Sequence, residues 1–98
     1  MAFEIVLTKR AEKDFENILQ YILLDFGQSA AVRFKDLTFE FLSILEKFPE
    51  IGIILIAEKD IRSVVIHKRL KVFYRIKDTK IILLRLFDTR QHPGKAID

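Results

Sequence analysis

The stretch Ile61–Phe87, "IRSVVIHKRLKVFYRIKDTKIILLRLF", decides the fold that we predict from the sequence. Apolar and charged side chains alternate in it with a period of two, which is typical of strands with one buried and one solvated face. The segments "HKRL" and "KDTK" interrupt this pattern as hairpin connections do. We therefore predict three strands in succession, Ile61–His67, Lys71–Lys77 and Lys80–Phe87.

The middle predicted strand separates an apolar face from a basic one, because successive side chains point to opposite sides. The apolar side holds Val72, Tyr74 and Ile76, and the other side holds Lys71, Phe73, Arg75 and Lys77. The last strand, "IILLRLF", is nearly all apolar, which is expected of a strand covered on both sides. The preceding segment "GIILIA" (Gly52–Ala57) fits either a further short strand or a buried loop.

Two amphipathic helices are predicted before these strands, because apolar residues recur there at steps of three and four. Thr8 is the predicted N-cap of the first helix and Gly27 its end, whereas Ser29 opens the second and Pro49 stops it. The short connection makes them an αα-hairpin. The predicted apolar stripes are Ala11, Phe15, Ile18, Leu19, Ile22, Leu23 and Phe26, followed by Phe34, Leu37, Phe41, Ile44, Leu45 and Phe48.

A further strand candidate, "FEIVL" (Phe3–Leu7), precedes the helices, so the element order is β-α-α-β-β-β. A helical hairpin returns the chain to the end it left, and the next strand then runs antiparallel to the first. We predict an α+β fold in which the helical hairpin packs on one face of a twisted antiparallel sheet. With 98 residues, half of them hydrophobic, residues 1–98 form a single predicted domain.

The composition excludes several classes of protein. The chain contains no Cys, which excludes disulfides and thiolate metal sites, and three Gly cannot form a phosphate-binding loop. His67 and His92 lack ligand-spaced companions, so we predict neither a metal site nor a cofactor. No signal sequence and no apolar run of ~20 residues is present, so we expect a soluble cytoplasmic protein without a membrane segment.

The charge is unevenly distributed along the chain. Residues 1–60 carry 7 Lys or Arg and 11 Asp or Glu, a net charge of −4, whereas residues 61–98 carry 10 and 3, a net charge of +7. Such asymmetry favours an anionic partner, although an ordinary solvated sheet face is the alternative. The candidate anion-binding or target-binding residues are Lys68, Arg69, Lys71, Phe73, Arg75, Lys77 and Arg90, in which cations would bind phosphates and Phe73 would stack on a base.

Four further residues have individual interpretations. We predict that Arg85, which interrupts an apolar strand, is a partly buried structural arginine paired with a helix carboxylate. Tyr74 shares the Val72 face and is predicted to lie in the core with its hydroxyl at the edge. His67 is predicted to be a solvated turn residue, and His92 is either a general acid or base near neutral pH or an ordinary tail residue.

Four segments together resemble the RelE/ParE superfamily of bacterial type II toxins, also called plasmid-stabilisation proteins. They are "LTKRAEKDFENILQYI" (Leu7–Ile22), "FPEIG" (Phe48–Gly52), "IRSVVIHKRLKVFYRI" (Ile61–Ile76) and "ILLRLFDTRQHP" (Ile82–Pro93). The resemblance covers nearly the whole chain in the right order. The fold that it implies, a helical hairpin on an antiparallel sheet, matches the layout predicted from the residue pattern.

The resemblance implies a toxin that is neutralised by a cognate antitoxin. The antitoxin's acidic, partly disordered C-terminal segment would fold on binding, which supplies a reason for the basic half of this chain. Apolar side chains exposed on the helical hairpin would be covered by the same partner. The candidates are Leu24, Val32, Phe39 and Leu42.

The superfamily divides by target. RelE-like members are endoribonucleases that enter the ribosome and cut mRNA, with cations and commonly a C-terminal Tyr or His at the site. ParE-like members inhibit DNA gyrase and perform no known bond chemistry. Because "YIxxDFG" and "FDTRQHP" resemble the ParE branch more closely, we expect a ParE-like gyrase inhibitor. A RelE-like ribonuclease and a non-toxic basic module that binds nucleic acid are the alternatives.

Under the RelE-like alternative, the resemblance carries catalytic roles to specific positions. Two other positions of that pattern hold residues that cannot serve, because Val64 stands where a second Lys is expected and Ala96 where the tyrosine is expected. His92 would then replace the tyrosine as the proton-transfer group. The candidate catalytic residues of this alternative are Arg62, Lys71, Arg90 and His92.

Overall fold

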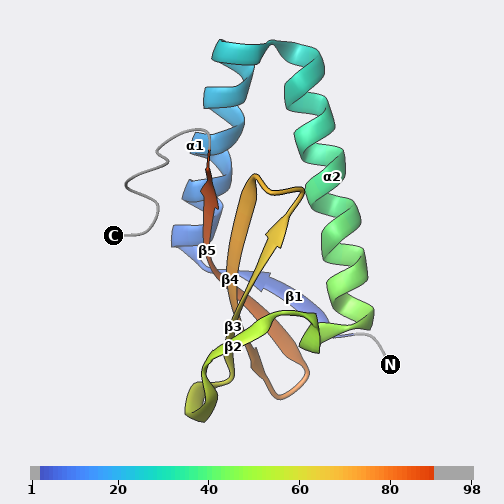
Figure 1. Ribbon diagram of the computed structural model, residues 1–98, viewed down its shortest axis with the longest axis vertical. Coiled ribbons are helices and arrows are strands. Elements are labelled where there is room, and N and C mark those ends of the chain that lie inside the picture. Colours follow the sequence, from blue (N-terminus) through green and yellow to red (C-terminus); the bar gives the residue numbers. More distant parts are fainter. Residues whose placement is uncertain (1–2, 90–98) are drawn as a thin grey trace.

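The structure, a computed structural model, describes residues 3–89 and consists of two antiparallel helices packed against one face of a five-stranded sheet (Figure 1). Short 3₁₀ turns at Pro49–Ile51 and Ala57–Lys59 flank the second strand. The helices are α1 (Lys9–Phe26) and α2 (Gln28–Lys47). The strands are β1 (Glu4–Leu7), β2 (Ile53–Ile56), β3 (Ile61–Ile66), β4 (Leu70–Lys77) and β5 (Lys80–Asp88).

The helical hairpin begins and turns where the sequence predicts. The Thr8 hydroxyl accepts a hydrogen bond from the Ala11 amide at 3.0 Å, which confirms Thr8 as the N-cap of α1. Gly27 has a φ of 93°, which favours glycine, and its amide donates to the Leu23 carbonyl at 3.1 Å. The same glycine precedes α2, so the second helix begins at Gln28 and not at Ser29.

The second helix buries a narrower stripe than predicted. Phe34, Phe41 and Leu45 are buried, but Ile44 and Phe48 are exposed, so the prediction for these last two residues is wrong. Ile44 lies about 100° around the helix from Leu45, beyond the edge of the buried stripe. Phe48 follows the last helical residue and leaves the stripe altogether.

The sheet confirms the α+β fold class and corrects one feature of its pairing. The strand order is β1-β5-β4-β3-β2, with antiparallel pairs throughout except that β1 runs parallel to β5. The expectation of a wholly antiparallel sheet is therefore wrong. The reason is that Ile53–Ile56 forms a strand, so four strands follow the helices and the last of them runs in the direction of β1.

A bulge at Leu84 interrupts the alternation of inward and outward side chains along β5. Phe73 pairs with Arg85 and Tyr74 with Leu83, which leaves Leu84 without a partner on β4. The outer face of this strand is only half-buried, so the predicted cover on both sides is not seen among residues 3–89. The apolar composition of β5 instead reflects its position between β1 and β4.

The core lies between the helical hairpin and the inner face of the sheet. As predicted, Tyr74 belongs to this core; it is fully buried, and its hydroxyl donates to the Pro49 carbonyl at 2.7 Å and accepts from the Gly52 amide at 2.9 Å. The principal core residues are Ala11, Ile18, Ile22, Phe34, Phe41, Leu45, Val72, Tyr74, Ile81, Leu83 and Leu86.

Candidate functional site: the basic face of β4 and the β3–β4 turn

The outer face of β4 carries the alternating basic residues that the sequence predicts. Lys71, Phe73 and Arg75 are half-buried and Lys77 is exposed, whereas the intervening Val72 and Tyr74 are buried. Because no bulge interrupts β4 itself, the four outward side chains share one face. We call this set, Lys71, Phe73, Arg75 and Lys77, the basic β4 face.

Cations and aromatic rings alternate across β4 and β5 on this face. Lys71 is paired with Phe87 and Phe73 with Arg85, so each cation lies opposite a ring. The Lys71 ammonium lies 5.2 Å from the centre of the Phe73 ring, and the Arg85 guanidinium lies 4.5 Å from that of Phe87. The two rings meet edge to face at 5.8 Å. These cation–π contacts hold the long side chains over the sheet, and the rings themselves do not neutralise a positive charge.

Arg85 is, as predicted, a structural arginine. Its Nε donates to Asp14 Oδ2 at 2.7 Å and its guanidinium also reaches Asp14 Oδ1 at 3.3 Å, so the pair is bidentate. The same Oδ2 accepts the Leu86 amide at 3.0 Å. Since β1 pairs only with Lys80–Leu83, the carboxylate of α1 occupies the place that a longer β1 would take beside β5.

Arg62 lies on the opposite side of the sheet from the basic β4 face. It is paired with the buried Tyr74 and is itself only 9 % exposed. Its Nε donates to Asp60 Oδ1 at 2.8 Å, and its Nη1 donates to the Glu50 and Gly52 carbonyls at 3.2 Å each. Its donors are thus directed to residues on both sides of β2 in the chain, and Arg62 and Lys71 do not share a site.

The β3–β4 turn (residues 67–69) presents further cations at one end of the sheet. The Arg69 amide donates to the Ile66 carbonyl at 3.0 Å, which closes a four-residue turn whose central residues are His67 and Lys68. Both have positive φ, 51° and 62°, where glycine or asparagine is normally found. His67 is exposed, as predicted for a turn residue. Backbone strain at two residues other than glycine is a reason to examine this turn for function.

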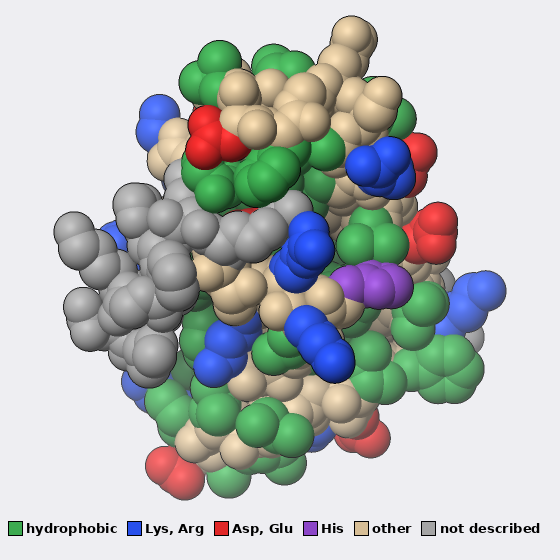
Figure 2. All heavy atoms as spheres, turned by 45° about the horizontal axis from the view of Figure 1, so that its top comes forward, with side chains coloured by type: hydrophobic (Ala, Val, Ile, Leu, Met, Phe, Trp, Pro, Cys, Tyr) green, Lys and Arg blue, Asp and Glu red, His purple; other side chains and the backbone are tan. Residues whose placement is uncertain are grey.

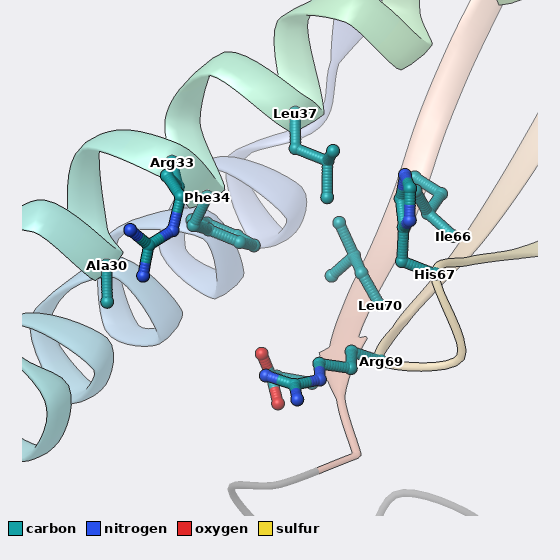
Figure 3. Close-up of a pocket in the computed structure, with 9 residues that line it drawn as sticks. Ala30, Arg33, Phe34, Leu37, Ile66, His67, Arg69 and Leu70 are labelled. Atoms are coloured by element: carbon teal, nitrogen blue, oxygen red, sulfur yellow. The ribbon is translucent and has the colours of Figure 1, made fainter.

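A cavity of about 420 Å³ separates this turn from α2 (Figure 3). Arg33 from α2 and Arg69 from the turn border it, Asp88 from β5 supplies one carboxylate, and Phe34 and Leu70 supply apolar walls. Among residues 3–89, neither of these arginines forms an ion pair. Figure 2 shows Lys and Arg side chains gathered around the histidine drawn in purple at this end of the molecule. The arrangement suits carboxylates or phosphates that approach over an apolar floor.

The sequence did not point to Arg33, because one arginine on the polar side of a helix has no distinguishing local pattern. Arg33 lines the same cavity as Arg69 only because the folded chain brings α2 and the β3–β4 turn to the same end of the molecule. The predicted residues Arg90 and His92 lie outside the described residues. The last described residue, Thr89, is fixed to the turn, because its amide donates to the Arg69 carbonyl at 2.7 Å.

Other kinds of site receive no support from the described residues. Within residues 3–89, no three His, Cys, Asp or Glu side chains gather as metal ligands. Neither α1 nor α2 has the length and hydrophobicity that crossing a membrane requires. What residues 3–89 present is a cationic surface made of the basic β4 face, with the β3–β4 turn at one end of the same strand.

The described residues thus form a small α+β protein with a cationic sheet surface. Residues 5–93 match the sequence model described as the ParE toxin of the type II toxin–antitoxin system. The chain therefore belongs to the ParE toxin family. A comparison with curated proteins finds no similar sequence.

Solved structures share the fold at low sequence identity. The chromosomal ParDE toxin–antitoxin system from P. aeruginosa matches with a TM-score of 0.73 at 18% identity, over 89% of this chain and 96% of that one. The RelBE2 toxin–antitoxin complex from Mycobacterium tuberculosis matches at 0.61 and 23%, over 90% and 99%. A copper-bound mutant toxin from Helicobacter pylori matches at 0.60 and 22%, over 92% and 98%.

Proposed function

We propose that this toxin inhibits DNA gyrase through protein contacts made by the basic β4 face, and that a cognate antitoxin neutralises it. The observation that carries the proposal is the match of residues 5–93 to the ParE family, joined to the cations of the basic β4 face. Among these cations, Arg75 donates through its Nε to the Lys59 carbonyl at 3.0 Å. Lys71 and Lys77 form no ion pair among residues 3–89. Uncompensated charge of one sign destabilises a protein unless a partner of the other sign meets it.

The position of Arg62 favours gyrase inhibition over RNA cleavage. A ribonuclease of the RelE type would need Arg62 and Lys71 at one phosphate, because its cations stabilise a single transition state. Here they lie on opposite faces, and the donors of Arg62 are directed to Asp60 and two carbonyls. Val64, which stands at the expected second lysine, offers no replacement.

The antitoxin part of the proposal rests on two surfaces. The cavity between Arg33 and Arg69 suits an acidic segment with an apolar side chain. On the helical hairpin, Leu24, Val32 and Phe39 are exposed and Leu42 is half-buried, so an apolar partner surface would cover them. The similar structures from P. aeruginosa and M. tuberculosis are toxin–antitoxin systems, which supports an antitoxin partner here.

The experiment compares toxicity and target for the wild-type protein and a charge-reversed variant. Induced expression should stop growth, and the purified protein should block gyrase supercoiling while leaving mRNA intact in a translation extract. The variant Lys71→Glu/Arg75→Glu/Lys77→Glu should lose at least about 100-fold in inhibition, because like charges across an interface cost several kcal/mol.

A matched control changes the same amount of charge on exposed positions of the helices, as Lys13→Glu/Lys35→Glu/Lys47→Glu. This control should inhibit gyrase nearly as well as the wild type. Cleavage of mRNA at the ribosome by the wild type would select the RelE-like activity instead. Unimpaired growth on expression would contradict the toxin function itself.

A further inference from the structure

An ion pair joins α1 to the outer face of the sheet, at the edge of β5 that β1 leaves uncovered. β1 pairs with β5 only as far as Leu83, and beyond this point Asp14 Oδ2 accepts the Leu86 amide at 3.0 Å. The same carboxylate accepts two bonds from the Arg85 guanidinium, at 2.7 and 3.3 Å. The side chains of Asp14 and Arg85 are 15% and 32% exposed. A helix residue thereby fixes a side chain on the face that points away from the helices.

The contacts continue from Arg85 to Lys71 through two aromatic rings. The Arg85 guanidinium lies 4.5 Å from the centre of the Phe87 ring, and this ring meets that of Phe73 edge to face at 5.8 Å. The Lys71 ammonium in turn lies 5.2 Å from the centre of the Phe73 ring. We call this set, Asp14, Arg85, Phe87, Phe73 and Lys71, the Asp14–Lys71 series. It connects α1 to the basic β4 face without a gap.

The two cations of the series differ in what their charge can do. Arg85 already has an anionic partner, because Asp14 binds its guanidinium at two positions. Lys71 forms no ion pair among residues 3–89. The ring beneath Lys71 attracts the ammonium but does not cancel its charge. An anion that approaches this face would therefore meet the charge of Lys71.

The position of Lys71 should make its contact with a partner less costly. A lysine side chain that moves freely in water loses rotamer freedom when a partner fixes it, which lowers affinity. Lys77 is such a residue, since it is exposed and forms no cation–π contact among residues 3–89. Lys71 is half-buried and rests over Phe73, so it has lost part of this freedom on folding.

We propose that Asp14 is a positioning residue of the basic β4 face. It fixes Arg85, and the rings of Phe87 and Phe73 transmit this constraint to Lys71, which is thereby held ready for an anionic partner. The inference rests on the proposed function, because the partner concerned is the one that the basic β4 face would meet. It adds a residue of α1 to a binding surface whose other members all belong to the sheet.

The first experiment follows Lys71 by the NMR shift of its Cε protons, which the ring current of Phe73 should move upfield of those of Lys77. The variant Asp14→Asn/Arg85→Met removes one charge of each sign, so the net charge of +3 is unchanged. Both rings remain in this variant, so a change of shift reports movement of Lys71. Its protons should move toward the position of those of Lys77.

Two further variants keep this measurement decisive. Asp14→Asn alone retains a side-chain oxygen for the Leu86 amide and should shift the Lys71 protons in the same direction, even if the double variant folds poorly. The control Lys35→Met/Glu40→Gln removes the same two charges from exposed positions of α2 and should leave the shift unchanged. Lys71 protons that stay at their wild-type position in both Asp14 variants would overturn the proposal.

The second experiment measures whether the position of Lys71 matters for inhibition, by titrating gyrase supercoiling of relaxed plasmid with each purified variant. Asp14→Asn/Arg85→Met should raise the inhibitory concentration about 5-fold, because the partner must then order Lys71 itself. In a Lys71→Met background the same double change should have no further effect, since it acts through that lysine. An equal loss in both backgrounds would show a general structural role and would contradict the proposal.

A variant in the middle of the series supplies an independent check. Phe87→Leu removes the ring but leaves the ion pair of Asp14 and Arg85 in place, and it should weaken inhibition as the double variant does. Phe87→Tyr keeps the ring and should inhibit like the wild type. If Phe87→Leu inhibits as well as Phe87→Tyr, the rings do not transmit the constraint and the proposal is wrong.

The positioning role and the proposed function fail in different ways. A wild type that does not inhibit gyrase contradicts the proposed function, whereas the NMR shift of Lys71 still decides whether Asp14 positions this residue. A wild type that inhibits gyrase, with a Lys71 shift that the Asp14 variants leave unchanged, contradicts the positioning role alone.

Discussion

On the inner side of the sheet, Arg62 is buried and bonded to Asp60 and to two backbone carbonyls. On the outer side, Lys71 rests over the ring of Phe73 without an anionic partner among residues 3–89. The two residues lie on neighbouring strands and carry the same charge. The difference teaches that the surroundings on each face of the sheet decide how a cation is used. Arg62 is held by hydrogen bonds within the protein, whereas the ammonium of Lys71 is free to meet a binding partner.

The largest expected effect tests the inner cation. Arg62→Met should lower the free energy of unfolding by about 3 kcal/mol, because it removes three hydrogen bonds and leaves two carbonyls and the Asp60 carboxylate without that donor. Lys71→Met should change it by less than about 0.5 kcal/mol, because methionine keeps the half-buried apolar stem and Lys71 has no ion pair among residues 3–89. Denaturant unfolding of both variants measures the contrast. Equal losses would show that the two faces do not differ as described.

The next effect concerns Tyr74, which lies opposite Arg62. Tyr74→Phe should cost about 2 kcal/mol in unfolding free energy, because the Gly52 amide and Pro49 carbonyl lose a buried partner. The hydroxyl fits closely against the backbone of Gly52, since a Cβ at that position would lie only 2.6 Å from the tyrosine oxygen. Urea titration at neutral pH tests this value.

The same tyrosine predicts a loss of stability in alkali. Burial raises the pKa of Tyr74 above its ordinary value of 10.0, and the Gly52 hydrogen bond and Arg62 charge offset only part of that rise. The unfolded chain therefore releases this proton first, so stability is complete below pH 10 and falls as the pH rises through the folded-state pKa. A pH series of unfolding curves should show this extra decline in the wild type and lack it in Tyr74→Phe.

A smaller effect of opposite sign is expected at the β3–β4 turn. Lys68→Gly should raise the free energy of unfolding by about 1 kcal/mol, because glycine adopts a φ of 62° without the steric cost that lysine carries. Lys71→Gly is the control and should lower it, since glycine weakens a strand interior. Thermal unfolding distinguishes the two. A destabilised Lys68→Gly would mean that the lysine side chain itself supports the turn.

Lys77→Ala should have the smallest effect on stability, but it should change how strongly partner binding depends on salt concentration. Lys77→Ala, at an exposed position of the basic β4 face, should leave unfolding within about 0.5 kcal/mol of the wild type. If the basic β4 face meets an anionic partner, this variant should nevertheless bind that partner with a weaker dependence on ionic strength. Binding isotherms at several salt concentrations provide the measurement, and an unchanged salt dependence would place the contact elsewhere.

Several features of this protein could be predicted from short stretches of sequence. The capping of α1 by Thr8 and the alternation of β4 follow from residues a few positions apart, and both are confirmed. The pairing of Arg85 with a helix carboxylate was also predictable, because a lone arginine in an apolar strand needs a partner. Its identity as Asp14 was not, since the two residues are 71 positions apart.

The candidate site was less predictable than the fold. The period of two placed Lys71, Phe73, Arg75 and Lys77 on one face. Likeness to RelE-like members placed Arg62 in one catalytic set with Lys71, whereas in the structure these two residues lie on opposite faces of the sheet. Arg33 was missed for the converse reason, because it faces the same cavity as Arg69 only once the helical hairpin lies over the sheet.

By itself the sequence determined the helices, most strand boundaries and the faces of β4, because caps, breakers and periodicity act between residues close in the chain. Only the tertiary structure decided that Ile53–Ile56 is a strand, that β1 lies parallel to β5, and that Arg62 is buried and bonded. These outcomes depend on which distant segments pack together and on the burial that results, and neither can be predicted from local periodicity.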